Sequence, residues 1–281
     1  MLLTQSKPFT NSFMNFTPRR FMIIGTGFIF PKHFYAIKEI GGEIVDIVNE
    51  GTNPNEWKKV LENTTADFVV ILTPNYLHYE MCKIAEAMGK IVLCEKPLTI
   101  NSKQLVKLGQ NVNVVLQLRY HPLVKKLKEL KKNKLIIELD IVMQRNESYF
   151  QGWKGQREKS GGLLFNLGIH YLDLLEYIFG KHTYARTNYL DNKVGYGGIR
   201  GENYLCTWRI EINNALSQHR IFKVNGESYD FSNKDNLSQE DLHKFVYRDL
   251  IVGKGVKPPE CVNSVKLVEK LNEYDLETRI K

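Results

Sequence analysis

The feature that most constrains the fold is a strand, a glycine turn, a helix and a second strand within the first fifty residues. The apolar run Arg20–Ile24 predicts a buried strand, and Gly25-Thr26-Gly27 turns the chain directly after it. Residues 28–40 have the pattern of a helix, and Glu43–Val48 has the pattern of the next strand. Two parallel strands need a crossover of this kind between them, so the segment predicts the start of a parallel sheet.

The same alternation continues to about residue 120. Further strands are expected at 67–72, 91–94 and 113–118, and helices at 55–63, 76–88 and 101–110. Regular strand-helix alternation is typical of a doubly wound α/β domain. We therefore predict an N-terminal tail over residues 1–20 and a dinucleotide-binding Rossmann domain over residues 21–121.

The pattern changes after residue 121. Strands are expected at 135–145, 183–188, 205–212, 220–224 and 229–231, and the Asn225-Gly226 pair favours a hairpin between the last two. Helices are expected at 125–134, 162–179, 237–253 and 262–274. Residues 122–281 thus predict an α+β domain with a large, mainly antiparallel open sheet. The sequence leaves open whether the helix expected at 262–274 packs back on the first domain.

Charge and hydropathy limit the class of partner. The chain of 281 residues is 43% hydrophobic, which suffices for packed cores, and its net charge of +8 suits anionic ligands. Much of the positive charge lies in residues 125–134, where leucines recur at helical spacing and no aromatic residue interleaves. A solvated amphipathic helix explains this run better than a nucleic-acid patch does. We therefore expect a small anionic molecule as ligand and no nucleic acid.

The cysteines and the terminal segments exclude other classes. Cys82, Cys94, Cys206 and Cys261 are too far apart in sequence for a zinc knuckle, so we expect buried free thiols in a reducing compartment and no metal. No apolar run is long enough to span a bilayer. The first twenty residues lack the apolar core of a secretory signal, so a cytoplasmic protein without a membrane partner is expected.

The glycine turn predicts the position of the cofactor. Gly25 and Gly27 match the first two glycines of the dinucleotide fingerprint, whereas Phe30 stands in place of the third. Phe28 and Ile29, at the helix start, are expected to meet the diphosphate. Asn49 stands where an acid would bind the adenosine ribose, and no arginine beside it would take a 2′-phosphate, so NAD is expected rather than NADP. The alternative is an ordinary strand-helix turn.

A lysine beside a carboxylate follows the fourth strand. Glu95-Lys96-Pro97 lies at the carboxyl edge of the sheet, where ligands bind in this fold. Burial next to a cationic nicotinamide should depress the pKa of Lys96 and suit it to proton transfer with a substrate hydroxyl. The alternative is a surface ion pair with Glu95, which would contribute little.

A second candidate group lies in the expected helix 162–179. Asn166, His170 and Asp173 are spaced to share one helical face. His170 is a candidate acceptor for the hydroxyl proton as hydride leaves the same carbon. Asp173 would orient the imidazole or bind substrate. The alternative is a structural histidine, although Gly168 and the polar neighbours favour a cleft.

Five stretches, at 73–79, 94–98, 117–121, 153–155 and 166–170, resemble the Gfo/Idh/MocA family of nicotinamide-dependent sugar oxidoreductases. Within the family they are most similar to the UDP-N-acetylglucosaminuronate (UDP-GlcNAcA) 3-dehydrogenases, and the resemblance covers about residues 21–274. It implies NAD-dependent oxidation of the sugar 3′-hydroxyl, ahead of a transaminase, in amino-sugar biosynthesis for surface polysaccharide such as lipopolysaccharide. Another sugar dehydrogenase of the family and a non-catalytic NAD-binding regulator remain as alternatives.

The resemblance also implies roles for individual residues. Lys96 and His170 would form the catalytic pair, Glu95 would contact the nicotinamide ribose, and Pro97 would follow a cis peptide. The remaining cofactor groove would be lined by Thr73, Pro74, Asn75 and His78. The nucleotide sugar would meet Gln117, Arg119, Lys154 and Asn166. A homo-oligomer, tetramer or dimer, would form through the outer face of the second sheet.

Overall fold

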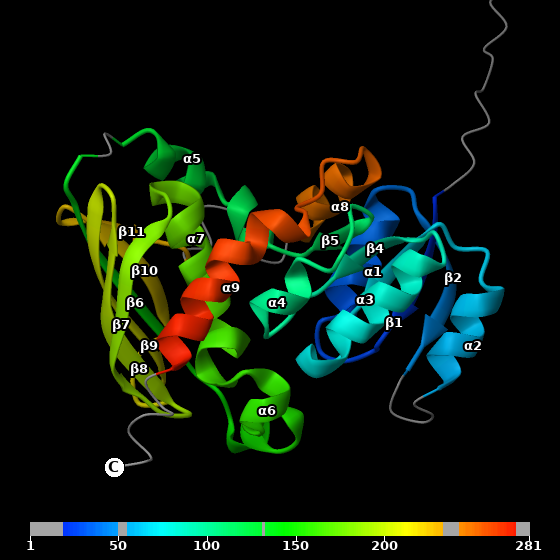
Figure 1. Cartoon of the computed structure of the whole chain (residues 1–281), viewed down its shortest axis with the longest axis horizontal. Coiled ribbons are helices and arrows are strands. Elements are labelled where there is room, and N and C mark those ends of the chain that lie inside the picture. The colour runs from blue at the N-terminus through cyan, green and yellow to red at the C-terminus, as the bar shows by residue number, and fades with distance from the viewer. Residues whose placement is uncertain (1–18, 50–54, 131–132, 233–241, 274–281) are drawn as a thin grey trace, which may run out of the picture.

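The computed structural model describes residues 19–49, 55–130, 133–232 and 242–273 (Figure 1). Two sheets lie at opposite ends of the long axis, with helices between them (Figure 1). This arrangement confirms the predicted pairing of a Rossmann domain with an α+β domain.

The first sheet has five parallel strands in the order β2-β1-β3-β4-β5. Its strands are β1 (Arg20–Ile24), β2 (Glu43–Val48), β3 (Phe68–Ile71), β4 (Ile91–Cys94) and β5 (Val112–Val114). Only β5 departs far from the prediction, because the chain leaves the sheet after it and Gln117–Tyr120 forms a 3₁₀ turn. The carboxyl ends of β1, β3 and β4 therefore meet at one edge.

Four α-helices connect these strands: α1 (Phe30–Glu39), α2 (Glu56–Asn63), α3 (His78–Ala87, after a 3₁₀ turn at Asn75–Leu77) and α4 (Ser102–Leu105). Helix α4 is shorter than the predicted 101–110. The carboxylate of Glu86 accepts hydrogen bonds from the backbone amides of Gly109 and Asn111, at 2.8 and 3.2 Å, which fixes the chain there in a turn. A side chain far away in sequence thus overrides the local helical pattern.

The second sheet has six strands in the order β11-β10-β6-β9-β8-β7, and every pairing is antiparallel except that of β6 with β9. The strands are β6 (Leu135–Met143), β7 (His182–Leu190), β8 (Val194–Gly201), β9 (Tyr204–Ile212), β10 (His219–Val224) and β11 (Glu227–Asp230). Strand β8 was not predicted, because its four glycines lower its strand propensity. Gly197 is required there, because a Cβ would lie 2.2 Å from the carbonyl oxygen of Arg186 on β7.

The helices of the second half are α5 (Pro122–Lys128), α6 (Arg157–Ser160), α7 (Ile169–Phe179), α8 (His243–Ile251) and α9 (Pro258–Asn272), with 3₁₀ turns at Glu147–Phe150 and Trp153–Gly155. The helix predicted over 162–179 is divided, since Leu164–Gly168 forms a π-helical turn before α7. The helix predicted over 125–134 ends at Lys128. Part of the one predicted over 237–253 lies outside the described residues.

The last two helices link the two halves of the molecule. Val246, Tyr247 and Leu250 of α8 pack in one core with Phe21 and Ile37 of the first domain. Helix α9 contacts α4 and β5 on one side and α7 and β7 on the other. The expected range 122–281 therefore includes one helix that packs on the first domain and one that touches both domains.

The four cysteines are buried free thiols. Within the described ranges, no helix combines the length and the apolar character that crossing a bilayer requires.

Candidate active site

The turn after β1 has the geometry of a phosphate-binding loop. Gly25 has a φ of +104°, and a Cβ there would lie 2.9 Å from the backbone carbonyl of Leu72. A Cβ on Gly27 would meet nothing within 4 Å, so space lies open above the turn. Gly25 is therefore needed for the close approach of two strands, whereas Gly27 leaves room for a ligand.

The helix start that follows offers unused donors. In the described part of the chain, the backbone amides of Thr26, Gly27, Phe28 and Ile29 donate to no acceptor. Free amides at a helix N-terminus bind a diphosphate, so this loop fits NAD. Phe30, in place of the third glycine, packs against the core of the first domain. Phe28 is 88% exposed, and Asn49, also exposed, directly follows β2.

The loops after β3 and β4 are joined by a buried histidine. His78 Nε2 lies 2.8 Å from the carbonyl oxygen of Thr73, and Nδ1 lies 2.7 Å from that of Pro97. Burial lowers the pKa of His78. The neutral ring can donate to only one of the two carbonyls. His78 thus links the loop after β3 to the loop after β4. Thr73 is buried, and Pro74 directly precedes the 3₁₀ turn Asn75–Leu77.

Glu95 belongs to a chain of buried polar side chains that the sequence pattern does not predict. His33 of α1 lies 3.0 Å from Glu95 Oε1 through Nε2 and 2.8 Å from the hydroxyl of Tyr247 through Nδ1. His243 Nε2 lies 3.8 Å from the same carboxylate oxygen. The other oxygen, Oε2, accepts from the amide of Lys96 at 3.1 Å. Helices α1 and α8, both distant in sequence, and the adjacent Lys96 therefore fix the orientation of this carboxylate.

The protonation states in this chain agree with one another. Burial alone would raise the pKa of Glu95, but its interactions with His243 and His33 lower the pKa well below its usual value. Burial lowers the pKa of His33 and raises that of Tyr247. Glu95 is thus an anion that accepts from the Nε2–H of neutral His33, whose Nδ1 accepts from the tyrosine hydroxyl. His33, Glu95 and His243 also place their ligand atoms within 4.8 Å of one another, a spacing that suits a metal ion.

Lys96 lies at the junction of the two domains. Its ammonium donates to the carbonyl oxygen of Asn166 at 2.8 Å, and its peptide bond to Pro97 is cis. Burial lowers its pKa to about 8 against the opposing effect of Glu95, and the charges of Lys154 and Arg145 lower it further. The lysine is therefore poised to exchange a proton near neutral pH.

His170 lies one turn beyond Asn166, close enough to Lys96 for their charges to interact. Burial, and then the charge of Lys96, hold its pKa well below the usual value, so the ring is neutral. Its buried Nδ1 has no hydrogen-bond partner within the described ranges. A neutral imidazole with an unsatisfied ring nitrogen can accept a hydrogen bond from a ligand or donate one to it.

Asp173 and Arg119 are arranged differently from the prediction. Asp173 accepts a bidentate bond from Arg119, at 2.7 and 2.8 Å, and a third bond from Ser264 Oγ at 2.6 Å. It is not among the partners of the His170 ring, so its expected role in orienting that ring is wrong. Side chains of both partners are less than a tenth exposed. Helical spacing placed Asp173 on the correct helix, but it could not show that the carboxylate is already paired with an arginine.

The remaining candidates surround the junction. Asn166 donates through Nδ2 to the carbonyl of Lys154 at 3.3 Å and accepts from Asn75 Nδ2 at 3.2 Å. Asn75 also donates to the carbonyl of Ser160 at 2.8 Å. Gln117 is 8% exposed, and its Oε1 is a buried acceptor without a donor among the described residues. Asn75 and Asn166 therefore hold the domains together, while Gln117 keeps an acceptor for a ligand.

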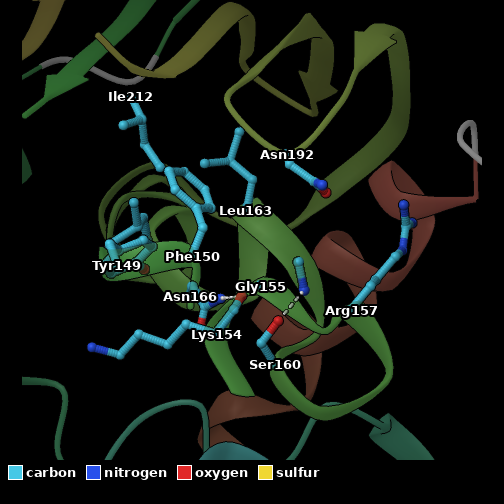
Figure 2. Close-up of a pocket in the computed structure, with 12 residues that line it drawn as sticks. Tyr149, Phe150, Lys154, Gly155, Arg157, Ser160, Leu163, Asn166, Asn192 and Ile212 are labelled. Carbon is cyan, nitrogen blue, oxygen red and sulfur yellow. Dashed lines mark hydrogen bonds between the residues drawn. The ribbon is translucent and has the colours of Figure 1, made fainter. Parts of the chain in front are cut away.

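A small cavity adjoins Asn166 in the second domain (Figure 2). It lies among Tyr149, Phe150, Arg157 and Leu163, and the Lys154 side chain runs away from it (Figure 2). The ammonium of Lys154 is therefore directed outside this cavity rather than into it.

Two family models cover most of this chain. Residues 19–119 match the NAD-binding Rossmann fold of the GFO/IDH/MocA oxidoreductase family, and residues 134–232 match its C-terminal alpha/beta domain. The chain belongs to the Gfo/Idh/MocA oxidoreductase family. Its first domain is accordingly an NAD-binding Rossmann domain, and the protein is an oxidoreductase.

Solved structures extend this likeness to both domains. The WlbA dehydrogenase of Thermus thermophilus, in complex with NAD and UDP-GlcNAcA, is 30% identical to this chain, with a TM-score of 0.82. The match covers 89% of this chain and 93% of the Thermus chain. The WlbA dehydrogenase of Bordetella pertussis has a TM-score of 0.78 at 20% identity, with 91% and 96% covered, and shows the fold alone.

Curated relatives match over shorter stretches. The levoglucosan dehydrogenase of Pseudarthrobacter phenanthrenivorans is 24% identical over 163 residues, which are 52% of this chain and 41% of that protein. Across four such relatives, the chain spans 36% to 52% of their length. Identity at this level supports the family without defining a substrate.

The two turn glycines give a matched pair of variants. Gly25→Ala should lower the melting temperature by several degrees and abolish NAD binding, because its Cβ would clash with the Leu72 backbone at a strained φ. Gly27→Ala should fold as the wild type does, since its Cβ meets no protein atom, but should bind NAD at least ten-fold more weakly. Thermal unfolding and calorimetric titration with NAD would measure both effects. Unchanged NAD affinity in Gly27→Ala would show that the diphosphate lies elsewhere.

Proposed function

We propose that this protein is an NAD-dependent dehydrogenase that oxidises the 3′-hydroxyl of UDP-GlcNAcA to the 3-keto sugar, in amino-sugar biosynthesis for surface polysaccharide. The observation that carries the proposal is the position of Lys96, at the carboxyl edge of the NAD-binding sheet and bonded to the turn that leads into the helix of His170. The hydrogen bond of Lys96 to Asn166 brings the first residue to the helix that carries the second. Two groups suited to proton transfer thus lie where a nicotinamide-dependent oxidation needs them.

The chemistry follows from the protonation states. Oxidation of an alcohol removes a hydride from the carbon and a proton from the hydroxyl oxygen, and bound NAD would accept the hydride. With a pKa near 8, Lys96 in its neutral form takes the hydroxyl proton and becomes an ammonium that Asn166 O and the anionic Glu95 stabilise. Neutral His170, whose Nδ1 has no partner among the described residues, is the alternative base.

Glu95 is proposed to contact the nicotinamide ribose, since its carboxylate is held rigidly at the strand end. The loop of Gly25, Gly27, Phe28 and Ile29 would bind the diphosphate, with Asn49 at the adenosine ribose. Thr73, Pro74, Asn75 and His78 would line the groove. Gln117, Lys154 and Asn166 would meet the nucleotide sugar, while Arg119 and Asp173 would support the site from behind.

The substrate class rests on charge and on similarity. The Thermus thermophilus protein was solved with UDP-GlcNAcA and matches this chain over nearly its whole length. That molecule carries a carboxylate and a diphosphate, and this chain carries a net charge of +8. Both observations favour an anionic nucleotide sugar over a neutral free sugar.

Purified protein with NAD and candidate sugars would test the reaction. We expect reduced nicotinamide to accumulate with UDP-GlcNAcA and at least ten-fold more slowly with UDP-GlcNAc. Lys96→Met should lower kcat by a factor of about 10² to 10⁴, the usual contribution of a general base, and should retain NAD binding. Turnover of UDP-GlcNAc alone would assign the protein to a different sugar dehydrogenase. No turnover with any sugar, despite NAD binding, would favour a regulator.

The pKa of Lys96 predicts a pH dependence. Burial disfavours the ammonium, so the neutral amine that acts as base becomes populated as the pH rises through about 8. The kcat/KM for oxidation should therefore increase from pH 6 to pH 9 and level off above the pKa. Steady-state kinetics across this range would measure it, after a check by circular dichroism that the fold persists. A kcat/KM that stays level across this range would instead favour His170, whose pKa is held well below its usual value by burial and by the charge of Lys96, as the base.

We also propose that the outer face of the second sheet joins two copies of the chain. Ile136, Leu205, Arg200 and Tyr184 form one row across four neighbouring strands. Ile136 and Leu205 are each 54% exposed and Tyr184 is 51% exposed. A sheet face with this much exposed apolar surface favours a partner surface, and closed symmetry makes a second copy the simplest one.

A charge in the middle of that row should separate the copies. Leu205→Glu is expected to convert a dimer or tetramer to a smaller species in sedimentation or light scattering, because the carboxylate would be buried against apolar surface. Val106→Glu, on the first domain at a position 71% exposed, is the matched control and should leave the mass unchanged. A monomeric wild type at micromolar concentration would contradict the proposal.

A further inference from the structure

Two cations meet at one aromatic ring beside the catalytic lysine. The guanidinium of Arg145 lies 5.5 Å from the centre of the Tyr149 ring, and the ammonium of Lys154 lies 4.9 Å from the same centre. Arg145 comes two residues after β6, and Lys154 lies in the 3₁₀ turn Trp153–Gly155. A single short segment thus brings two positive charges together.

Neither cation is neutralised by the protein. Arg145 donates to the carbonyl oxygen of Gln144 at 2.7 Å and lies 3.9 Å from the Met143 sulfur. Over the ranges that the structure describes, neither Arg145 nor Lys154 pairs with a carboxylate. Like charges that share a partly buried ring repel each other, and an anion between them would remove that repulsion.

The pair is connected to the reaction centre by one residue. Asn166 donates to the carbonyl oxygen of Lys154 at 3.3 Å and accepts from the ammonium of Lys96 at 2.8 Å. The charges of Lys154 and Arg145 both lower the pKa of Lys96, and Arg145, after burial, lowers the pKa of Lys154. The three cations therefore lie within range of one another's fields.

The arginine expected to bind the substrate anion is already committed. Arg119 is held by the bidentate bond to Asp173 and lies 3.8 Å from a carboxylate oxygen of Glu260, and its side chain is 6% exposed. Removing it from Asp173 would leave a buried carboxylate without its cation, which is strongly destabilising. An acidic substrate must then be bound by other cationic side chains, ones that are not paired with a carboxylate of the protein.

We propose that Arg145, acting with Lys154, binds an acidic group of the substrate and discriminates anionic from neutral substrates. This inference rests on the proposed nucleotide-sugar dehydrogenase activity. The acidic group is a carboxylate or a phosphate, since Arg145 and Lys154 suit either one. Arg145 also acts through charge on Lys96, because its positive field favours the neutral amine that accepts the proton.

The decisive variant is Arg145→Gln. We expect its KM for UDP-GlcNAcA to rise about 10- to 100-fold, the range for losing a charge-assisted hydrogen bond, with a smaller change in kcat. The inflection of kcat/KM with pH should move above that of the wild type, because one of the charges that lower the pKa of Lys96 is gone. Arg248→Gln, an exposed arginine paired with Glu39, is the matched control and should change neither value.

Comparison of two substrates identifies the acidic group. A rise in KM for UDP-GlcNAcA alone, with the KM for UDP-GlcNAc unchanged, would show that Arg145 and Lys154 bind the carboxylate. An equal rise in KM for both substrates would show that they bind the diphosphate. Unchanged KM on both substrates and an unchanged pH inflection would overturn the proposal. The KM of Arg145→Lys should lie between that of the wild type and that of Arg145→Gln. This variant provides the test if the glutamine variant does not fold.

Direct binding separates this proposal from the proposed function. If the wild type oxidises no nucleotide sugar, the dehydrogenase assignment fails. Calorimetry with UDP-GlcNAcA, in the presence of NAD, would still test the anion site. Binding that weakens in Arg145→Gln and with added salt would support the site. Binding equal in the wild type and the variant would refute it.

Discussion

One hydrogen bond organises the site: the ammonium of Lys96 donates to the carbonyl oxygen of Asn166 at 2.8 Å. It joins a strand end of the NAD-binding sheet to the π-helical turn of the second domain, and Asn75 makes a parallel link to the Asn166 side chain. A wide π-helical turn leaves backbone carbonyls less completely paired than an α-helix does, so such a turn can offer an acceptor to a distant lysine. The contact brings the lysine to the segment that leads into the helix of His170.

The protonation of Lys96 results from opposing contributions. Burial and two nearby cations disfavour the ammonium, whereas Glu95 directly before it favours the ammonium. Glu95 can do so only while it is ionised in a buried place, and that requires the donor from His33 and the proximity of His243. His33 is in turn bonded to Tyr247 on a helix more than two hundred residues away. The return of α8 to the first domain thus contributes to the chemistry and to the core.

The sequence predicted those features that depend on local pattern. Strands β1, β2 and β4 begin and end where expected, because short apolar runs bounded by glycine or charged residues specify buried parallel strands. The positions of Gly25, Glu95, Lys96 and His170 followed from the same pattern. Partners were not predictable: Arg119 with Asp173, and His33 with Glu95, each join segments more than fifty residues apart. Strand β8 was missed because its pairing with β7 and β9 compensates for glycines that weaken a strand in isolation.

Electrostatics also explains why the substrate end of the cleft differs from the cofactor end. Around Glu95 the charges are balanced, since one anion accepts from neutral His33 and directly precedes one lysine. Around Tyr149 they are not, since two cations share the ring. Burial raises the pKa of the Tyr149 hydroxyl to about 12 against the opposing effect of Arg145, whereas burial and then the charge of Arg145 lower the pKa of Lys154. A fold tolerates such an imbalance at a partly exposed edge when a ligand supplies the missing charge. The same positive field that attracts the acid also keeps Lys96 ready to accept a proton, so recognition and reactivity depend on one set of charges.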